Sequence, residues 1–332
     1  MKSYFFVFLF FIYLATEAQT KSAIVFYNTE NFFDTINNPN KSDEEYLPYS
    51  DLKWNSEKYF NKISKIGQVI DSIGSQSGNL PIIIGFCEIE SGTAIEDLIK
   101  KSSLNKGNYA YKITDSPDTR GINLALLFRT SYFDCIKKDE INVSDPEQEQ
   151  YFTRNILYVK LKSKKGEFLH VFVNHWPSRR GGEKESESKR IYAAKKLRSK
   201  TDSILREDKS AQLIIMGDFN DHPNDKSIKE ILISNNSGLI NLFEKEHLEG
   251  RGSHYYDGQW GVLDQIIFSE GFLEKKGWYC TKTKAEAYRA NFLLFKNNKT
   301  GEIKPNRTFG GTKYYNGYSD HLPVFIEVEE KK

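Results

Sequence analysis

Asp218 and Asn220 lie directly after a short apolar segment, residues 213–216, which is typical of a strand buried on both faces. The two side chains are two residues apart, so they point the same way if the chain stays extended. A carboxylate and a carboxamide at the end of a rigid strand can bind and activate a polar substrate. Both residues also suit a turn for local reasons, so this segment alone leaves both interpretations open.

The same arrangement recurs at five other places where a predicted strand ends or begins. Each of these places carries a carboxylate, a carboxamide or an imidazole. Asp264, at the start of a strand, could also be a simple cap. The residues at these places are Asn28, Glu88, His175, Asp264, Asp320 and His321. As a set, they are difficult to explain as turn residues alone.

These residue types favour one class of chemistry and argue against several others. Carboxylates are the hard oxygen ligands that Mg²⁺, Mn²⁺ or Ca²⁺ prefer. The sequence has no HExxH motif, no GxSxG motif and no GxxxxGK[ST] motif, so a zinc protease, a serine hydrolase and a P-loop enzyme are disfavoured. Carboxylates together with imidazole and amide donors suit metal-assisted hydrolysis of a phosphoester.

The composition is that of a globular protein with a large core. The chain has 332 residues, of which 39% are hydrophobic, and its net charge is only +2. This balance does not by itself indicate a nucleic-acid binder, although a local basic patch is compatible with it. The three cysteines include no CxxC pair, and Cys87 lies in an apolar segment typical of the core.

The N-terminus has the pattern of a secretory signal peptide. Lys2 precedes an apolar stretch at residues 4–14, and small residues follow at 16–18. We therefore expect cleavage after Ala18, a single domain over residues 19–332, and a secreted or periplasmic protein. An uncleaved anchor is the alternative. The apolar stretch is too short for an ordinary membrane span, so we expect no stable membrane association. We also expect a monomer.

The hydrophobic patterns predict many strands and a few long helices. We expect helices at 57–73, 93–100 and 189–205, and an exposed loop at 178–188. Residues 281–317, rich in Lys, Asn and Gly, are expected to form a long loop. Such an order favours a core of two packed sheets with helices outside. The predicted strands are 23–27, 81–86, 109–113, 122–128, 132–143, 156–161, 168–173, 213–216, 263–268 and 322–328.

The polar strand ends resemble, in type and order, the motifs of the endonuclease/exonuclease/phosphatase superfamily, whose fold is DNase I-like. The resemblance extends from Ala23 to Val328. It implies a four-layer α/β/β/α sandwich of two mainly antiparallel sheets, with the active site at one end. The matching segments are Tyr27-Asn28-Thr29-Glu30, Phe86-Cys87-Glu88, Val173-Asn174-His175, Gly217-Asp218-Phe219-Asn220, Leu263-Asp264-Gln265 and Ser319-Asp320-His321-Leu322-Pro323-Val324.

The resemblance implies a divalent metal, with Mg²⁺ expected and Mn²⁺ or Ca²⁺ as alternatives. It makes Glu88 the principal metal ligand and places Asp320 near the metal. Glu30 matches a position that is acidic in some members and is a further candidate ligand. Arg154 resembles an arginine that contacts phosphate in the nuclease members; its alternative interpretation is a surface arginine.

The remaining matches imply roles in the reaction itself. Asp218 would orient or deprotonate the attacking water, while Asn220 and Asn28 would donate hydrogen bonds to the phosphate. Asp264 would pair with His321 and favour its protonated form. His175 would be a second imidazole at the reacting group, but residues 120–123 offer no acidic partner for it. Three histidines match no family position and are expected to be surface or loop residues: His222, His247 and His254.

The substrate is less strongly indicated than the chemistry. A nuclease acting on DNA or RNA is the first hypothesis, because two groups of basic residues flank the motifs. Acidic neighbours cancel part of this charge. A phosphodiesterase or phosphatase acting on lipid head groups or small phosphates is the second hypothesis, and we identify no exposed aromatic hairpin. A non-catalytic binding module is the third. The basic residues are Arg179, Arg180, Lys184, Lys189, Arg190, Lys304, Arg307 and Lys313.

Overall fold

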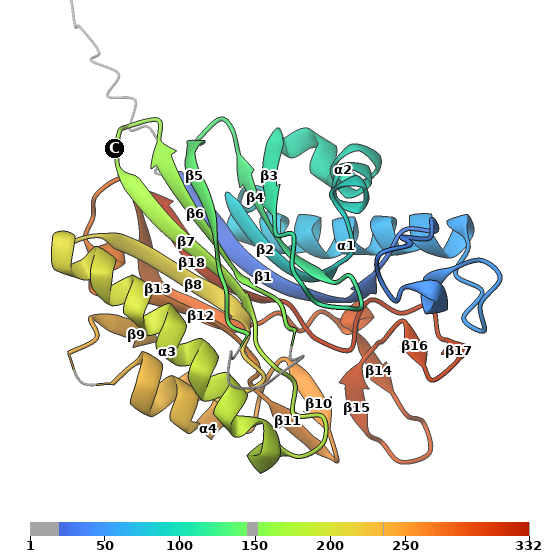
Figure 1. Cartoon of the computed structure of the whole chain (residues 1–332). Helices are drawn as coiled ribbons and strands as arrows, with labels where there is room; N and C mark the ends of the chain where they lie inside the picture. Colours follow the sequence, from blue (N-terminus) through green and yellow to red (C-terminus); the bar gives the residue numbers. More distant parts are fainter. Residues whose placement is uncertain (1–19, 145–151, 235, 332) are drawn as a thin grey trace, which may run out of the picture.

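The computed structural model describes residues 20–144, 152–234 and 236–331. Two six-stranded sheets pack face to face, and helices cover their outer surfaces (Figure 1). This confirms the expected α/β sandwich of two mainly antiparallel sheets. The predicted signal peptide at 1–18 lies outside the described residues.

The first sheet has the strand order β13-β18-β1-β2-β4-β3. Only β1 and β2 run parallel, and all its other neighbouring pairs are antiparallel. Its strands are β1 (Lys21–Phe32), β2 (Ile83–Ile89), β3 (Tyr109–Ile113), β4 (Asn123–Arg129), β13 (Trp278–Ala287) and β18 (Val324–Glu330).

The second sheet has the order β5-β6-β7-β8-β12-β9 and again contains one parallel pair, β7 with β8. The two parallel pairs occupy equivalent central places in their sheets. The strands are β5 (Phe133–Ile141), β6 (Ile156–Ser163), β7 (Phe168–His175), β8 (Gln212–Asp218), β9 (Leu239–Asn241) and β12 (Asp264–Ser269).

A helix connects the two strands of each parallel pair, as parallel strands require. Helix α1 (Ser56–Ser77) joins β1 to β2, and α3 (Glu183–Glu207) joins β7 to β8. Asn55 caps the start of α1 through a bond from the Lys58 backbone N–H, and Gly78 ends the helix in a left-handed conformation with φ 87°. Helix α2 (Gly92–Lys101) packs beside α1 on the first sheet, and α3 covers the second (Figure 1).

The core between the sheets is dense and apolar. Gly85 of β2 faces Met216 of β8 so closely that a methyl group at Gly85 would clash with the Met216 side chain. Cys87, as expected, is a fully buried core thiol. A second apolar cluster fills the space between α3 and the outer face of the second sheet. The Gly85–Met216 contact therefore requires a residue without a side chain where the two sheets approach each other.

The shorter elements lie mainly in the connections. The hairpins are β10 (His254–Tyr256) with β11 (Gln259–Gly261), β14 (Leu294–Lys296) with β15 (Ile303–Pro305), and β16 (Phe309–Gly310) with β17 (Lys313–Tyr314). The short helices are α4 (Glu244–Leu248), the 3₁₀ turns Glu44–Tyr46, Ser103–Gly107, Glu270–Leu273 and Asn291–Leu293, and a π-helical turn at Ser227–Leu232.

Two of the expected segment assignments are wrong. Residues 281–317 are not one long loop, because β13 extends to Ala287 and two hairpins follow it. Their polar residues suit edge strands and small hairpins, which bury little surface. Helix α3 begins at Glu183 rather than 189, so much of the expected loop is its first turns. Among the described residues, no helix is long and apolar enough to cross a membrane.

His170 provides a test of the fold through its pH dependence. It is buried on the outer face of β7 and its Nδ1 lies 2.8 Å from the Tyr158 hydroxyl. Burial, followed by the charges of Lys160 and Lys200, lowers the pKa of His170 to about 4. In the unfolded chain the pKa of His170 has its ordinary value of about 6.5. As the pH falls below about 6.5, His170 therefore gains a proton in the unfolded state before it does so in the folded state.

We therefore expect the free energy of unfolding to fall as the pH drops from about 6.5 to about 4, by at most about 1.4 kcal/mol per pH unit from this group. Urea unfolding of the wild type and of His170→Gln across this range measures the effect. The variant should show a shallower pH dependence. Equal slopes in the two proteins would contradict the assignment.

Candidate active site

The predicted site residues converge at one end of the sandwich, where both parallel strand pairs terminate. β1 and β2 bring Asn28 and Glu88, and β7 and β8 bring His175 and Asp218. Strands β12 and β18 run antiparallel to these pairs, so their beginnings lie at the same end and carry Asp264 and, just before β18, Asp320 and His321.

Strand register explains how three of these side chains come together. The Cα of Asp218 pairs with His175 on one neighbouring strand and with Asp264 on the other. Residues paired across neighbouring strands point to the same face of a sheet. The second sheet therefore presents a row of an imidazole and two carboxylates toward the first sheet.

The first sheet meets this row through Asn28. Its side-chain amide donates to Asp218 Oδ2 at 3.1 Å and to Glu88 Oε1 at 3.4 Å. Its Oδ1 accepts from the Glu30 backbone N–H at 3.0 Å. Asn28 was expected to donate to the substrate phosphate, but both of its amide hydrogens are directed at carboxylates. The structure thus makes Asn28 the residue that orients Asp218 and Glu88 across the two sheets.

Left-handed backbone conformations concentrate at this end of the strands. Glu30, Asn31, Glu88 and Asn220 have φ values of 50°, 51°, 61° and 50°. The β1–β2 ladder changes register between Asn28 and Phe32, and the β2–β4 ladder between Cys87 and Ile89. Such bulges redirect side chains, and they bring the Glu88 carboxylate to the strand end.

Asp264 and His321 form the pair that the sequence indicated. Asp264 Oδ2 lies 2.7 Å from His321 Nδ1 and also accepts a hydrogen bond from the Ser253 hydroxyl. Despite burial, the charges of Asp264 and Asp218 raise the pKa of His321 well above its usual range. His321 is therefore an imidazolium at neutral pH. Ser253 was not singled out from the sequence, because it matches no motif.

Asp218 lies between two imidazoles. Its Oδ2 is 3.9 Å from His321 Nε2 and 3.7 Å from His175 Nε2, and its Oδ1 accepts from the Asn220 backbone N–H at 2.9 Å. Burial raises the pKa of Asp218 to about 7, against the lowering effect of His321. A carboxylate with this pKa can accept a proton near neutral pH. The Asn220 amide donates to the Trp176 carbonyl at 3.1 Å, which leaves one of its hydrogens for a substrate.

His175 differs from His321 in how it meets carboxylates: its Nε2 lies 3.7 Å from Asp218 Oδ2 and 3.9 Å from Glu88 Oε1, whereas His321 Nδ1 is hydrogen-bonded to Asp264 at 2.7 Å. Burial, then the charges of Arg154 and Arg120, lower the pKa of His175 well below its usual range, so the ring is neutral. Its buried Nδ1 has no hydrogen-bond partner among the residues that the structure describes. A neutral imidazole facing Asp218 can donate a hydrogen bond to a bound oxygen.

The three candidate metal ligands differ in how free their oxygens are. Glu88 Oε2 accepts from the Asn31 backbone N–H at 2.8 Å, and Asp320 Oδ2 lies 3.1 Å from the Arg307 guanidinium. Both carboxylates keep lone pairs for a cation. Glu30 instead accepts from the backbone N–H groups of Thr308 at 2.6 Å and Phe309 at 3.3 Å. Glu30 therefore anchors that loop.

One further group has metal-binding geometry. Asp218, Asp264 and His321 each place one ligand atom within 4.8 Å of the others. The Asp264–His321 hydrogen bond already uses one atom of each of these two residues, whereas Glu88 and Asp320 each keep lone pairs that no hydrogen bond occupies. Hard carboxylate oxygens without thiolates fit Mg²⁺, Mn²⁺ or Ca²⁺.

Arg154 is placed differently from its predicted role. Its guanidinium is buried, pairs with Asp118 at 3.2 Å and donates to the Trp176 carbonyl at 2.8 Å. It braces the loop that follows His175, and the alternative of a surface arginine is wrong because the side chain is buried. Asp118, its partner, could not be identified from the sequence because the two residues are far apart in the chain.

Part of the predicted basic surface is also not available to a substrate. Arg190 is fully buried and its Nε lies 2.6 Å from Asp221, while Arg179 lies 2.6 Å from Asp225. These ion pairs fix the end of β8 to α3. In contrast, Arg307 and Lys313 are exposed, and Arg307 lies 3.1 Å from Asp320.

His254 is not the surface residue that its lack of a motif suggested. Its ring centroid lies 4.6 Å from that of His321, and the two residues form an isolated backbone bridge. Burial, then the charge of His321, lower the pKa of His254 to about 4. His222 and His247 stack on each other at 4.9 Å, with His222 partly buried. Such contacts leave no local signal in the sequence.

Comparison with known proteins agrees with this geometry. A family model described as endonuclease/exonuclease/phosphatase family matches residues 23–330. The chain belongs to this family. Its members are phosphoesterase hydrolases, and the family resemblance of the sequence motifs is confirmed. No curated protein sequence matches the chain.

Solved structures of family members share the fold at low sequence identity. A family protein from Bacteroides thetaiotaomicron is 16% identical with a TM-score of 0.60, and covers 95% of this chain and 100% of its own. A mannosyl-6-phosphatase from the same organism is 17% identical with a TM-score of 0.59, at 92% and 99% coverage. Human nocturnin, with bound sulfate, is 15% identical with a TM-score of 0.57, at 95% and 97% coverage.

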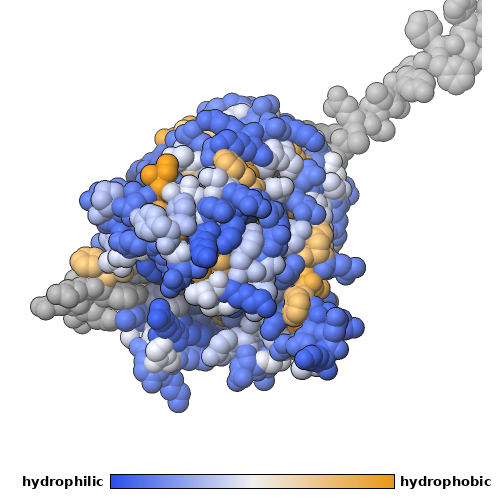
Figure 2. Space-filling view, turned by 90° about the vertical axis from the view of Figure 1, so that its right-hand side faces the viewer, coloured by the Kyte–Doolittle hydropathy of each residue, from blue (hydrophilic) through white to orange (hydrophobic). Residues whose placement is uncertain are grey.

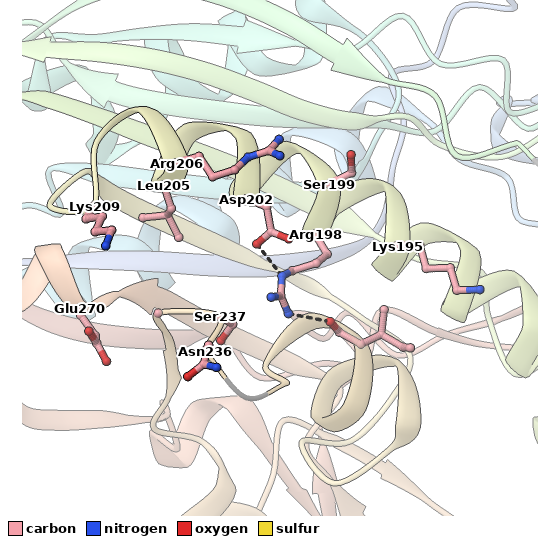
Figure 3. Close-up of a pocket in the computed structure, with 12 residues that line it drawn as sticks. Lys195, Arg198, Ser199, Asp202, Leu205, Arg206, Lys209, Asn236, Ser237 and Glu270 are labelled. Carbon is pink, nitrogen blue, oxygen red and sulfur yellow. Dashed lines mark hydrogen bonds and ion pairs between the residues drawn. The ribbon is translucent and has the colours of Figure 1, made fainter.

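A cavity of about 990 Å³ lies away from the motif residues, between α3 and the segment after the π-helical turn (Figure 3). In it, Arg198 pairs with Asp202 at 2.6 Å and donates to the Ile231 carbonyl at 3.2 Å. None of the motif residues lines this cavity. Size alone therefore does not identify the site, and the converging carboxylates and imidazoles do.

The Asp264–His321 pair can be tested directly by NMR titration of ¹³C-labelled histidine. In Asp264→Asn the negative charge and the charge-assisted hydrogen bond are lost, so the pKa of His321 should fall. The exposed Glu230→Gln is a matched carboxylate-to-amide control and should leave it unchanged. An unaltered His321 titration in Asp264→Asn would show that the two side chains do not interact in solution.

Proposed function

We propose that this protein is a metal-dependent phosphoester hydrolase that acts outside the cytoplasm. The observation that carries the proposal is the position of Asp218, buried between the His175 and His321 imidazoles and oriented by Asn28. Asp218 as a base, His321 as a cationic donor and His175 as a neutral donor then face the same position, where a phosphate can bind. The apolar N-terminal segment at residues 4–14 supports secretion, and the mass of the exported chain would test cleavage after Ala18.

Each side chain can be given a part in hydrolysis. Asp218 accepts the proton of the attacking water, and His321, held by Asp264, donates to the phosphate oxygen that gains charge. Asn220 and His175 donate to the other oxygens. Glu88 and Asp320 would hold a divalent cation, which supplies charge neutralisation for the phosphate when bound.

A small phosphoester is the substrate class that the surroundings favour. Arg179 and Arg190, expected to contact a nucleic-acid backbone, are neutralised by Asp225 and Asp221. A nuclease is the second candidate, supported by the exposed Arg307 and Lys313 and by the shared fold with zebrafish TDP2 solved with a single-strand DNA product, which is 15% identical.

Lipid head groups are the third substrate class. No aromatic hairpin was expected from the sequence, but Tyr256 on β10 and Phe295 on β14 are exposed. The face of the molecule seen in Figure 2 is mostly hydrophilic, and its hydrophobic residues form separate small patches. The isolated aromatic side chains offer contact points for a lipid surface without an extended apolar face.

A substrate panel tests the proposal. We expect the mature protein to hydrolyse p-nitrophenyl phosphate or bis-p-nitrophenyl phosphate with Mg²⁺, Mn²⁺ or Ca²⁺, and to lose this activity with EDTA. Plasmid DNA, single-stranded DNA, RNA and sphingomyelin complete the panel. Turnover of no substrate would refute phosphoester hydrolysis. Rapid cleavage of nucleic acid with weak cleavage of small esters would make the nuclease the function.

The site assignments predict large losses of activity. Glu88→Gln, Asp218→Asn and His321→Ala should each lower kcat/KM by at least about a hundredfold, as expected for general-base and electrostatic groups. The exposed Glu230→Gln should retain full activity. Circular dichroism and thermal melting establish that each variant is folded. Near-normal activity in any folded site variant would remove that residue from the site.

A further inference from the structure

A small cavity of about 140 Å³ lies directly beside the candidate metal ligands. Glu30, Asn31 and Arg307 line the side nearest the site. The Asn31 backbone N–H donates to Glu88, and the Arg307 guanidinium lies 3.1 Å from Asp320. Asn31 and Arg307 therefore each contact the cavity on one side and a candidate metal ligand on the other. If a phosphate is bound at those ligands, the group esterified to it can extend into the cavity.

The opposite wall is aromatic and rigid. The ring of Tyr46 stacks on Phe33 with centroids 4.2 Å apart and an interplanar angle of 7°. Trp54 packs edge-on against Tyr46 at 6.4 Å and lies 5.9 Å from Phe309. The Trp54 indole N–H donates to the Phe33 carbonyl at 3.0 Å. The wall formed by Tyr46 and Phe309 is thus fixed before any ligand binds.

The loop that carries Arg307 is also fixed from below. Glu30 accepts from the Thr308 and Phe309 backbone N–H groups, and its Oε1 lies 3.4 Å from Arg307 Nε. The buried Lys62 of α1 donates to the Thr308 hydroxyl at 2.6 Å and to the Tyr318 carbonyl at 2.6 Å. These bonds give the loop a single position although Arg307 itself is half exposed to solvent.

The chemistry of the lining indicates what the cavity accepts. The carboxylates of Glu30 and Glu45 repel a second anionic group and accept hydrogen bonds, whereas Arg307 donates them. Such polar walls disfavour an acyl chain. An aromatic face opposite hydrogen-bonding groups suits a ring that carries hydroxyls. The volume of about 140 Å³ has room for one ring only.

We propose that this cavity binds the sugar ring of a sugar phosphate whose phosphoester is hydrolysed at the adjoining site. The inference rests on the proposed function and narrows its substrate class. The aromatic wall contacts one face of the ring, Glu45 accepts from its hydroxyls, and Arg307 lies between ring and phosphate. Arg307 therefore contributes to binding of the sugar, which is the leaving group of the hydrolysis.

Calorimetric titration tests the cavity without turnover. With Mg²⁺ and the Asp218→Asn variant as background, glucose 6-phosphate should bind at least about tenfold more tightly than inorganic phosphate, because the ring adds contacts. The gain should disappear when Phe309→Ala or the exposed Glu45→Ala is added. Phe295→Ala, an exposed aromatic outside the cavity, is the matched control and should keep the gain.

The outcomes separate the two proposals. Equal affinities for glucose 6-phosphate and inorganic phosphate would overturn the cavity assignment, whatever the hydrolysis panel shows. An equal gain with n-butyl phosphate would overturn the sugar ring as the ligand class. Tighter binding of glucose 6-phosphate, with no hydrolysis of any ester by the wild type, would leave the cavity in place and refute the proposed function. If Phe309→Ala does not fold, Glu45→Ala alone decides the result.

Discussion

The buried positive charge of His321 allows Asp218 and Asp264 to lie opposite each other on neighbouring strands. Two like charges paired across a sheet would otherwise repel in a region without water. The imidazolium between them satisfies one carboxylate by a hydrogen bond and the other by proximity. The Asn28 amide then connects Asp218 to the opposite sheet. The position of one sheet relative to the other therefore depends on the same Asp218 carboxylate whose charge His321 balances.

The arrangement has an internal equivalence that the sequence does not reveal. Each sheet contains one parallel pair joined by a helix, β1-α1-β2 in the first and β7-α3-β8 in the second. Ligand sites in α/β sheets lie at the carboxyl ends of parallel strands, where the hydrogen-bonded pairing of the strands ends and polar side chains follow. Here two such ends face each other, so Glu88 from one unit and Asp218 from the other share a single buried space.

The sequence was sufficient to predict the fold, and its strand-end motifs, which are local patterns, predicted residues that the structure brings together at one end of the sandwich. It failed where side chains are paired over long distances. Arg154 and Arg190 carry the same charge as substrate-binding arginines, and only their contacts with Asp118 and Asp221 show that they are structural. His254 was missed for the same reason, since its contact with His321 joins distant segments. The polar composition of 281–317 concealed a strand and two hairpins.

The left-handed residues at the strand ends have a consequence for how the site can change. Glycine tolerates such a backbone more easily than glutamate, so substitution of Glu88 by glycine would relieve local strain while removing the carboxylate. Stability and chemistry thus oppose each other at this position. The left-handed backbone is held because the Glu88 carboxylate accepts hydrogen bonds from the Asn28 amide and the Asn31 backbone N–H, so the same side chain both causes the strain and supplies the contacts that offset it.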